Sequence, residues 1–399
     1  MIKTPAFKNP DYRRLWAGAA CNHLGMSGEQ VIFGLLIFRI TQSTAWVGVA
    51  LALYFLPLFI FGVLSGTIAD RVDRRTLLKR IELAILANMV LFAALVSAGY
   101  SGLWTVLSFI AIAGSLRALH QPVRISYAFD IVGGEHVVGS LGLLSLGTRF
   151  GQLIGALLAG TVMERVGTPG AFLALALMHA IAFGLFCRLR SVGIAEIAER
   201  VPIGQNLREF YDEMRGNRVL AMLVIVTASV EIFGFSFSTA LPELATQRFD
   251  FGAEGLGIMQ AARAMGGLIA SLLFSTMRET KRRGIAYLAV IYTFGGGLLL
   301  LSVSDTFVLA LAALLLVAAM ASASDILTQS MMQLSVPNRL RGRAMGAWVL
   351  AIGFAPIGHL EMGMLAVSLG ISNALLINGV LLIGLGLIAT LAVPRLRNT

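Results

Sequence analysis

Twelve apolar stretches, each long enough to cross a lipid bilayer, constrain this sequence more than any other feature. A span needs about 20 apolar residues, and in the hydrocarbon it must be helical because no water is present to bond its backbone groups. The sequence therefore predicts an all-α membrane protein with twelve transmembrane helices. The stretches run over approximately residues 15–39, 45–69, 77–99, 103–123, 137–163, 170–187, 219–241, 255–277, 285–303, 307–329, 344–369 and 372–393.

The composition agrees with a chain whose solvent is largely lipid. Hydrophobic residues make up 57% of the 399 residues and charged residues only 13%, whereas soluble domains carry about 25% charged residues. Both cysteines fall within hydrophobic stretches, which indicates neither a disulfide framework nor a metal site. Four histidines lie on separate spans without metal-ligand spacing, so we expect no metal and no cofactor. They are His23, His120, His179 and His359.

The basic residues are distributed unevenly along the chain. Of the 31 Lys and Arg residues, 25 fall on the termini and alternate connections, Arg124 being counted with them, while Arg39, Arg165 and Arg248 fall on the other side. An excess of Lys and Arg marks the cytoplasmic face. We therefore predict a multi-pass protein of the plasma (inner) membrane with both termini cytoplasmic, including a retained N-terminal arm. The net charge of +10 is then a topology signal, and no nucleic acid partner is expected.

A polar stretch divides the chain into two halves. Residues 188–218 are rich in Arg and Glu, which predicts a six-helix bundle over 1–187, a cytoplasmic linker over 188–218 and a second bundle over 219–399. A weak repeat supports the division. DRVDRR is matched by RETKRR, and GQLIGALLAG (151–160) is matched by GFAPIGHLEMG (353–363). The alternative explanation is that Gly is simply frequent in membrane helices. Two repeated halves with a site between them are a known transporter plan.

Three sequence motifs resemble those of the major facilitator superfamily. Residues 66–75 read GTIADRVDRR and resemble its signature loop G-x-x-x-D-R-x-G-R-R/K, with Asp73 in place of the second glycine. The fifth span is similar to the antiporter motif, although Ala156 stands where a proline normally follows. The connection before residue 344, with Gln333 and Pro337, resembles that of siderophore and macrolide exporters. The glycines of the fifth span, which favour close helix packing, are Gly142, Gly151, Gly155 and Gly160.

The resemblance implies two pseudo-symmetric six-helix bundles and a cytoplasmic gate. In the family fold Asp70 lies near the start of the eleventh span, where its carboxylate would face a helix N-terminus and pair with Arg341 or Arg343. The alternative is a solvated loop that obeys the positive-inside rule, which explains the arginines but not Asp70. The predicted gate residues are Gly66, Asp70, Arg71, Arg74, Arg75, Arg341 and Arg343.

Seven charged residues lie in the interior of the spans, where each costs about 2.5–3.5 kcal/mol on insertion scales, whereas the third span is expected to carry only terminal charges. Glu29, near the middle of its span, is the first candidate for proton coupling, and a structural pair with Arg117 or Arg149 is the alternative. Glu231, judged to hold the corresponding place in the other half, is the second candidate. In the family fold spans 1, 4, 7 and 10 line the central cavity, and each carries one of these charges. The seven are Glu29, Arg117, Arg149, Glu231, Arg263, Asp325 and Glu361.

Together these features predict a secondary transporter and not an enzyme. The resemblance implies proton-driven export of an amphipathic small molecule, such as a siderophore, macrolide or other drug, by a monomer in contact with membrane lipid. Uptake or facilitated transport of a nutrient or lipid-like solute is the alternative, and a membrane channel is the alternative from another class. The sequence contains no G-x-x-x-x-G-K-S/T, G-x-S-x-G or H-E-x-x-H motif, which disfavours a nucleotide-driven pump or a membrane enzyme.

Overall fold

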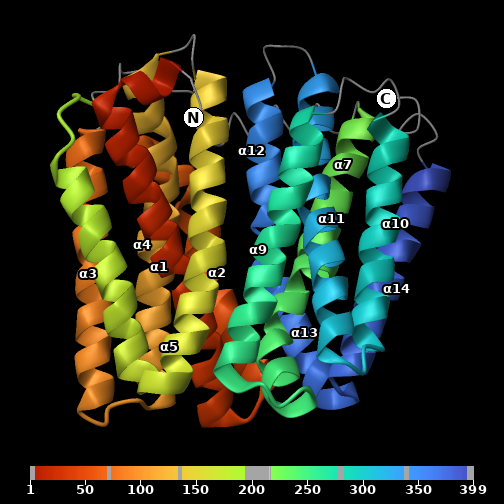
Figure 1. Cartoon of the computed structure of the whole chain (residues 1–399). Coiled ribbons are helices and arrows are strands. Elements are labelled where there is room, and N and C mark those ends of the chain that lie inside the picture. Colours follow the sequence, from red (N-terminus) through yellow and green to blue (C-terminus); the bar gives the residue numbers. More distant parts are fainter. Residues whose placement is uncertain are drawn as a thin grey trace. The chain divides into compact units, whose positions relative to one another are not determined.

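The computed structural model describes residues 5–69, 73–133, 137–193, 215, 217–276, 283–336 and 341–392, and within these ranges it contains helices and connections but no strand (Figure 1). Short polar side chains begin several helices. Asn9 caps the first long helix by accepting from the backbone N–H of Asp11, and Asp73 caps the third. The helices before residue 190 are η1 (Pro5–Lys8), α1 (Pro10–Thr41), α2 (Thr44–Ala69), α3 (Arg74–Ser97), α4 (Leu103–Val132) and α5 (Val137–Cys187).

The helix α5 contains two spans. Its 51 residues would extend about 77 Å as one helix, far beyond a hydrocarbon core of about 30 Å. Gly167, with φ 85° and ψ 177°, leaves the helical conformation, and Pro169 follows it. Ten of the described helices are long and apolar enough to cross a membrane, and a shorter apolar helix covers Thr44–Ile60. With α5 crossing twice, the described helices give the twelve predicted spans.

The seventh span departs from a regular α-helix. The chain passes from α7 (Arg218–Ser229) through the π-helical η3 (Val230–Gly234) and the 3-10 helix η4 (Phe235–Thr239) to α8 (Leu241–Glu243) and the π-helical η5 (Leu244–Arg248). π-Helical turns are rare and are frequent at functional sites. The remaining helices are α9 (Gly252–Thr276), α10 (Arg283–Ser302), α11 (Phe307–Leu334), α12 (Arg341–Ile352), α13 (Ala355–Leu369) and α14 (Ile371–Ala392).

One predicted boundary was wrong. The fourth span was expected to end at residue 123, with Arg124 in a cytoplasmic loop, but α4 continues to Val132 and Arg124 is only 5% exposed. Asp130, also beyond the predicted end, forms an ion pair with Arg74 at 2.6 Å. The hydropathy of the sequence placed the end of the span too early, because charged residues are assumed to lie in water. The side chains of Arg124 and Asp130 instead face other helices.

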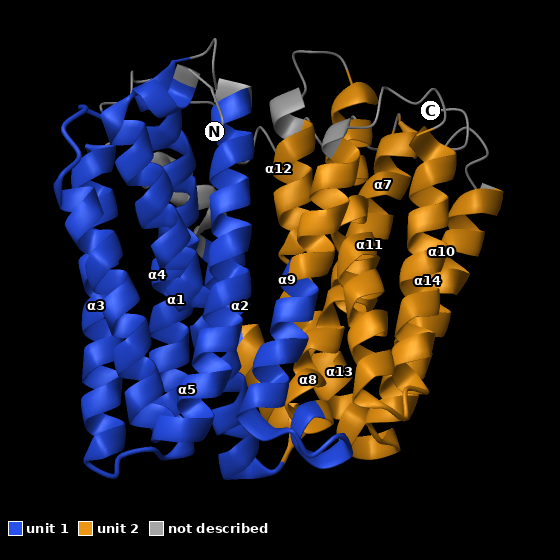
Figure 2. Ribbon diagram, viewed as in Figure 1, with its two compact units in different colours: residues 1–42, 53–197, 245–264 blue, residues 43–52, 198–244, 265–399 orange. Residues whose placement is uncertain are grey.

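The chain packs into two compact units (Figure 2). Unit 1 comprises residues 1–42, 53–197 and 245–264, and unit 2 comprises residues 43–52, 198–244 and 265–399. The first residues of α2 therefore belong to unit 2, and much of α9 belongs to unit 1. The bundle boundaries at residues 187 and 219 stay a prediction.

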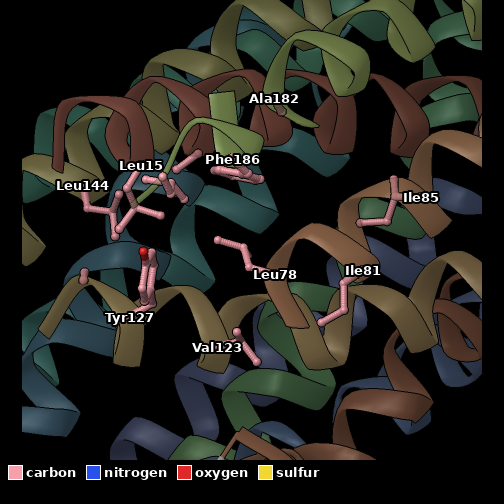
Figure 3. Close-up of a cluster of buried hydrophobic side chains, with 12 residues drawn as sticks. Leu15, Leu78, Ile81, Ile85, Val123, Tyr127, Leu144, Ala182 and Phe186 are labelled. Atoms are coloured by element: carbon pink, nitrogen blue, oxygen red, sulfur yellow. The ribbon is translucent and has the colours of Figure 1, made fainter. Parts of the chain in front are cut away.

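Unit 1 has an apolar core between α1, α3, α4 and α5 (Figure 3). Leu15, Leu78, Val123, Tyr127 and Phe186 are each less than 1% exposed within it. The Tyr127 hydroxyl donates to the backbone oxygen of Ser191 at 2.7 Å, so the core's polar atom is satisfied at its edge. This core forms one wall of the polar site described next.

Candidate functional site

A group of buried polar side chains lies between the same four helices of unit 1. Asn22 and Glu29 lie seven residues apart on α1, a spacing that places them on one face of a helix. Glu82 comes from α3, Arg117 from α4 and His179 from the second span of α5. Glu29, Glu82 and His179 are 0% exposed, and Arg117 is 9% exposed. Charged side chains this deeply buried must be paired.

Four of these side chains form a closed ring of hydrogen bonds. The Nη1 of Arg117 donates to Oδ1 of Asn22 at 3.0 Å, and Nδ2 of Asn22 donates to Oε2 of Glu82 at 2.6 Å. Oε1 of Glu82 lies 2.8 Å from Nδ1 of His179, and Nε2 of His179 lies 3.3 Å from Nη2 of Arg117. Glu29 binds the ring from outside, since its Oε2 accepts from Nη2 of Arg117 at 2.8 Å and from Nε at 3.2 Å.

The donors of Arg117 fix the protonation pattern of the ring. A guanidinium has N–H donors and no acceptor. Nε2 of His179, facing Arg117, must therefore be the unprotonated acceptor, which leaves the proton on Nδ1, where it is donated to Glu82. The same argument orients Asn22, with its oxygen toward Arg117 and its nitrogen toward Glu82. His179 is therefore neutral in this arrangement, and Arg117 holds both carboxylates, Glu29 directly and Glu82 through its two neighbours.

Two further side chains of α4 lie against this ring. Nε2 of His120 is 3.2 Å from Oε2 of Glu82, and His120 is 2% exposed. Arg124 is also buried, and its Nε and Nη1 atoms have no hydrogen-bond partner among the described residues. The described residues contain no group of three or more His, Cys, Asp or Glu side chains placed to hold a metal ion. The groups that meet here are carboxylates, imidazoles and guanidinium groups, whose chemistry is that of charge and proton transfer.

Apolar side chains seal the ring on both sides. Toward one end of the helices lies the core of Figure 3, with Phe186 seven residues beyond His179. Toward the other end Phe33, Phe92 and Phe172 form mutual ring contacts with centroids 4.7–5.4 Å apart. Gly25 of α1 provides the space for His179, because a Cβ there would lie 2.0 Å from Nε2. The ring thus lies in a buried layer, where electrostatic interactions are strong.

Glu82 was missed in the sequence, and His120 and His179 were judged to be scattered. The third span was expected to carry only terminal charges, but Glu82 lies eight residues after the start of α3 and is fully buried. The signal that could have revealed Glu82 was its position on one face of the helix. Leu78, Glu82, Ile85, Met89 and Phe92 follow the alternating four- and three-residue spacing of one helix face, which places a carboxylate in an otherwise apolar stripe.

In unit 2 the predicted site charges are carboxylates that lie on different elements. Glu231, on η3, is 6% exposed and makes no hydrogen bond or ion pair among the described residues. The charge that acts on it is that of Asp325 on α11, another carboxylate. Glu361 on α13 accepts from Nδ2 of Asn378 at 3.2 Å, and Asn378 also donates to Ser236. The structure thus gives Glu231 no cationic partner in the described residues.

Three of the four glycines of the fifth span allow close backbone contact, and the repeated segment in α13 makes matching contacts. A Cβ on Gly155 would lie 2.0 Å from the oxygen of Leu24 in α1, and one on Gly358 would lie 2.3 Å from that of Ile232 in η3. Gly151 likewise packs on α1, and Gly160 packs on Gly257 of α9. Gly142 has open space instead. In the two units, the fifth and eleventh spans therefore cross the first and seventh spans in the same way.

This matching shows that Glu231 does not correspond to Glu29. Glu231 directly precedes Ile232, whereas Glu29 comes five residues after Leu24. By this register the residue matched to Glu231 is His23, whose Nδ1 lies 3.4 Å from Nε2 of Gln152. The sequence comparison misplaced the pair because it counted position within each hydrophobic stretch, which does not fix helical register.

The predicted cytoplasmic gate is described only in part. The structure does not describe Asp70 or Arg71. It also leaves out the side chains of Arg341 and Arg343 and the surroundings of Gly66. The proposed latch therefore stays a prediction. Arg74 pairs with Asp130, and Nη1 of Arg75 donates to the oxygen of Arg190 at 3.2 Å. These two arginines of the motif therefore fix α3 to α4 and to the chain after α5.

Asp73, the departure from the family pattern, caps α3. Its carboxylate accepts from the hydroxyl of Thr76 at 2.6 Å and from the backbone N–H groups of Arg75 and Gly193. Partial burial opposes ionisation, but these hydrogen bonds outweigh it and hold the pKa of Asp73 below its ordinary value. Asp11 binds the same segment, accepting from the backbone N–H groups of Arg190 and Ser191. Two carboxylates thus anchor the chain that leaves α5.

The two remaining predicted cations lie on helices of unit 1. Arg149 is half-buried on α5, and Arg263, half-buried on α9, donates to Oε1 of Gln260 at 2.5 Å. The structure does not join Arg263 to the ring. With Arg117 and Arg124 they make unit 1 rich in buried or half-buried cations, in contrast to the three carboxylates of unit 2.

The fold and these buried charges define a polytopic membrane transporter. Residues 15–358 match the sequence model of the Major Facilitator Superfamily, and the chain belongs to this family. The predicted fold class, an all-α membrane protein of the major facilitator type, is confirmed.

Its relatives include proteins named as exporters. The chain is 24% identical over 355 residues to the Staphyloferrin A transporter of Staphylococcus aureus, covering 87% of this chain and 88% of that protein. It is 24% identical over 394 residues to the enterobactin exporter EntS of Shigella flexneri, covering 94% and 90%. It is 22% identical to the macrolide efflux protein A of Streptococcus pyogenes, covering 94% of each. The predicted resemblance to this branch is confirmed.

A solved structure shares the fold. The crystal structure of the nucleoside transporter NupG superposes with a TM-score of 0.79 at 12% identity, covering 95% of this chain and 98% of that chain. At this identity the similarity shows the fold alone.

Proposed function

We propose that this transporter exports an amphipathic small molecule, such as a siderophore, a macrolide or another drug, in exchange for protons. The observation that carries this proposal is the buried ring around Arg117. Side chains that are charged inside a membrane are costly and are retained where they bind an ion or substrate. The exporter names of the relatives support the direction, and both termini are proposed to lie in the cytoplasm.

Proton coupling is assigned to the buried carboxylates. Glu29 accepts from Arg117 through Oε2 only, and its buried Oε1 has no donor among the described residues. That oxygen has a lone pair available for a proton. Glu231, which has no cationic partner there, is the second carboxylate. Arg149, Arg263, Asp325 and Glu361 are proposed to serve substrate binding or gating.

The experiment that tests this function uses everted membrane vesicles containing the protein. A proton gradient is established and followed with a fluorescent pH probe, and enterobactin, staphyloferrin A and a macrolide are added separately. An antiporter dissipates the gradient when its substrate enters, because each substrate moved in returns protons. We expect this for at least one of the three probes and not in vesicles that lack the protein.

Three other outcomes would replace the proposal. Substrate movement down its own gradient without any change in the pH signal would indicate facilitated transport. Movement of substrate and protons in the same direction would indicate uptake of a nutrient or lipid-like solute. Ion conductance without saturation by any substrate would indicate a channel.

A further inference from the structure

The buried ring contains one nitrogen for which two partners compete. Nε2 of His179 accepts from Arg117 at 3.3 Å, and it is also the only ring nitrogen of His179 that has no proton. A proton bound there would turn the acceptor into a donor facing another donor. The guanidinium and the proton therefore cannot occupy this nitrogen together.

We propose that His179 is a second residue of unit 1, in addition to Glu29, at which an exchangeable proton binds, and that proton binding there releases Arg117 from α5. The inference rests on the proposed proton coupling and adds to it a residue and a direction. The step is a simple protonation: the lone pair of Nε2 takes the proton, and the hydrogen bond from Arg117 is lost. No other bond changes.

The charges of the ring favour this exchange. Without the added proton, Arg117 is the cation within the hydrogen-bonded ring, and it serves both Glu29 and Glu82. With it, each carboxylate has its own cation, since Glu82 is already 2.8 Å from Nδ1 of His179 and Glu29 is 2.8 Å from Arg117. Charge-assisted hydrogen bonds of this length are stronger than neutral ones. Releasing Arg117 thus creates two local ion pairs from one shared cation.

The surrounding groups act on this balance in both directions. Arg117 and Arg124 oppose a positive charge on an imidazole beside Glu82, while Glu82 favours it, as at the neighbouring His120. The titratable or charged groups around the ring are Cys21 and His23 on α1, Tyr54 on α2, Glu82 on α3, His120 and Arg124 on α4 and Arg149 on α5. Of His23, His120 and His179, it is His179 that contacts both Glu82 and Arg117.

The location of His179 connects protonation to conformation. Arg117 belongs to α4 and His179 to the second span of α5, so their hydrogen bond joins two helices. The apolar layers of Phe186 on one side and Phe172 on the other seal the site. These layers restrict the paths by which a proton can reach the ring from either end of the helices.

The direct test is solid-state NMR of the full-length protein, labelled with ¹⁵N-histidine and reconstituted in lipid bilayers without substrate. The ring nitrogens report which of them has a proton. We expect His179 to be protonated on Nδ1 alone in alkaline buffer, and a form protonated on both nitrogens to appear when the buffer is acidified. In Arg117→Gln the second proton should bind at a higher pH, because its competitor is absent.

Arg117→Gln leaves Glu29 buried without its cation, so the double variant Glu29→Gln/Arg117→Gln serves if the single one does not fold. The His179→Gln variant assigns the signal. A proton on Nε2 at high pH, or a titration that is the same with and without Arg117, would overturn the proposal.

Transport provides an independent measurement. In proteoliposomes, the rate of gradient-driven export should fall at least tenfold in His179→Gln and in Glu82→Gln. Both variants should still exchange the substrate that dissipated the proton gradient in the vesicle assay. His359→Gln is the matched control, a buried histidine of unit 2 whose Nδ1 lies 3.0 Å from Thr239. A rate of uphill export in His179→Gln equal to that of the native protein would also overturn the proposal. If the native protein transports none of the three probes in response to a proton gradient, the proposed function is overturned. The NMR result would then decide by itself whether His179 binds the proton.

Discussion

In unit 1, Glu29 and Glu82 are fully buried and accept hydrogen bonds from side chains on neighbouring helices, whereas in unit 2 the similarly buried Glu231 accepts none among the described residues. The backbones of the two units are alike at this level, because Gly155 and Gly358 make matching contacts with the first and seventh spans. Two units with the same helix arrangement can therefore differ in how their buried charges are paired. One unit gives its buried carboxylates hydrogen-bond partners, and the other leaves a buried carboxylate without one among the described residues.

The largest effect is expected where the pairing of unit 1 is broken. Glu29→Gln leaves the guanidinium of Arg117 buried without its direct counter-charge, and losing one partner of a buried pair costs about 3–5 kcal/mol. Unfolding of the purified protein in detergent, followed by heat or denaturant, measures this loss. The double variant Glu29→Gln/Arg117→Gln should recover most of it. A single variant as stable as the native protein would show that the ion pair does not stabilise unit 1.

A smaller effect is expected from the backbone contact that the units share. Gly155→Ala would place a Cβ 2.0 Å from the oxygen of Leu24, and Gly358→Ala one 2.3 Å from that of Ile232. Overpacking of this kind costs about 1–3 kcal/mol, so both variants should unfold at lower temperature. Gly142→Ala, with open space around it, is the control and should lose nothing. A loss at Gly155 but not at Gly358 would mean that the two contacts are not equivalent.

The cap formed by Asp73 should contribute about 1 kcal/mol. Asp73→Ala is expected to lose this amount near neutral pH, while Asp73→Asn retains most of the cap and loses the charge. Because the pKa of Asp73 is lower in the folded protein, its ionisation stabilises the fold above the ordinary aspartate value of about 4. This contribution disappears as the pH falls through the lowered pKa. Unfolding curves of the native protein and Asp73→Asn should therefore converge at acid pH.

The smallest change in stability is expected at Glu231. Glu231→Gln removes a buried carboxylate for which the described residues supply no cationic partner, so stability should be unchanged or slightly higher. Function should respond instead, with uphill export lost and exchange retained, as measured in proteoliposomes. A loss of stability as large as that of Glu29→Gln would reveal a partner for Glu231 and end the contrast between the units.

Much of the fold could be predicted because its signal is local. An apolar stretch of about 20 residues can only be a helix in lipid, and this placed all twelve spans within a few residues apart from the ends of α4 and of the seventh span. The Glu29–Arg117 pair was named in advance as an alternative because both are charged and mid-span. Glu82 was missed because it lies near the charged start of its helix, where a solvated position is the ordinary expectation.

The sequence by itself determined that this chain is a helical membrane protein of the major facilitator family, and it identified the charges that membrane burial makes costly. Only the tertiary structure decided which of them meet. The ring joins residues from α1, α3, α4 and α5 that are up to 157 positions apart, and hydrogen bonds depend on helix register to within a fraction of a turn. Hydropathy averages over many residues and therefore fixes the span but not the face, so the partners of Glu82 and the isolation of Glu231 emerged only when the helices were packed.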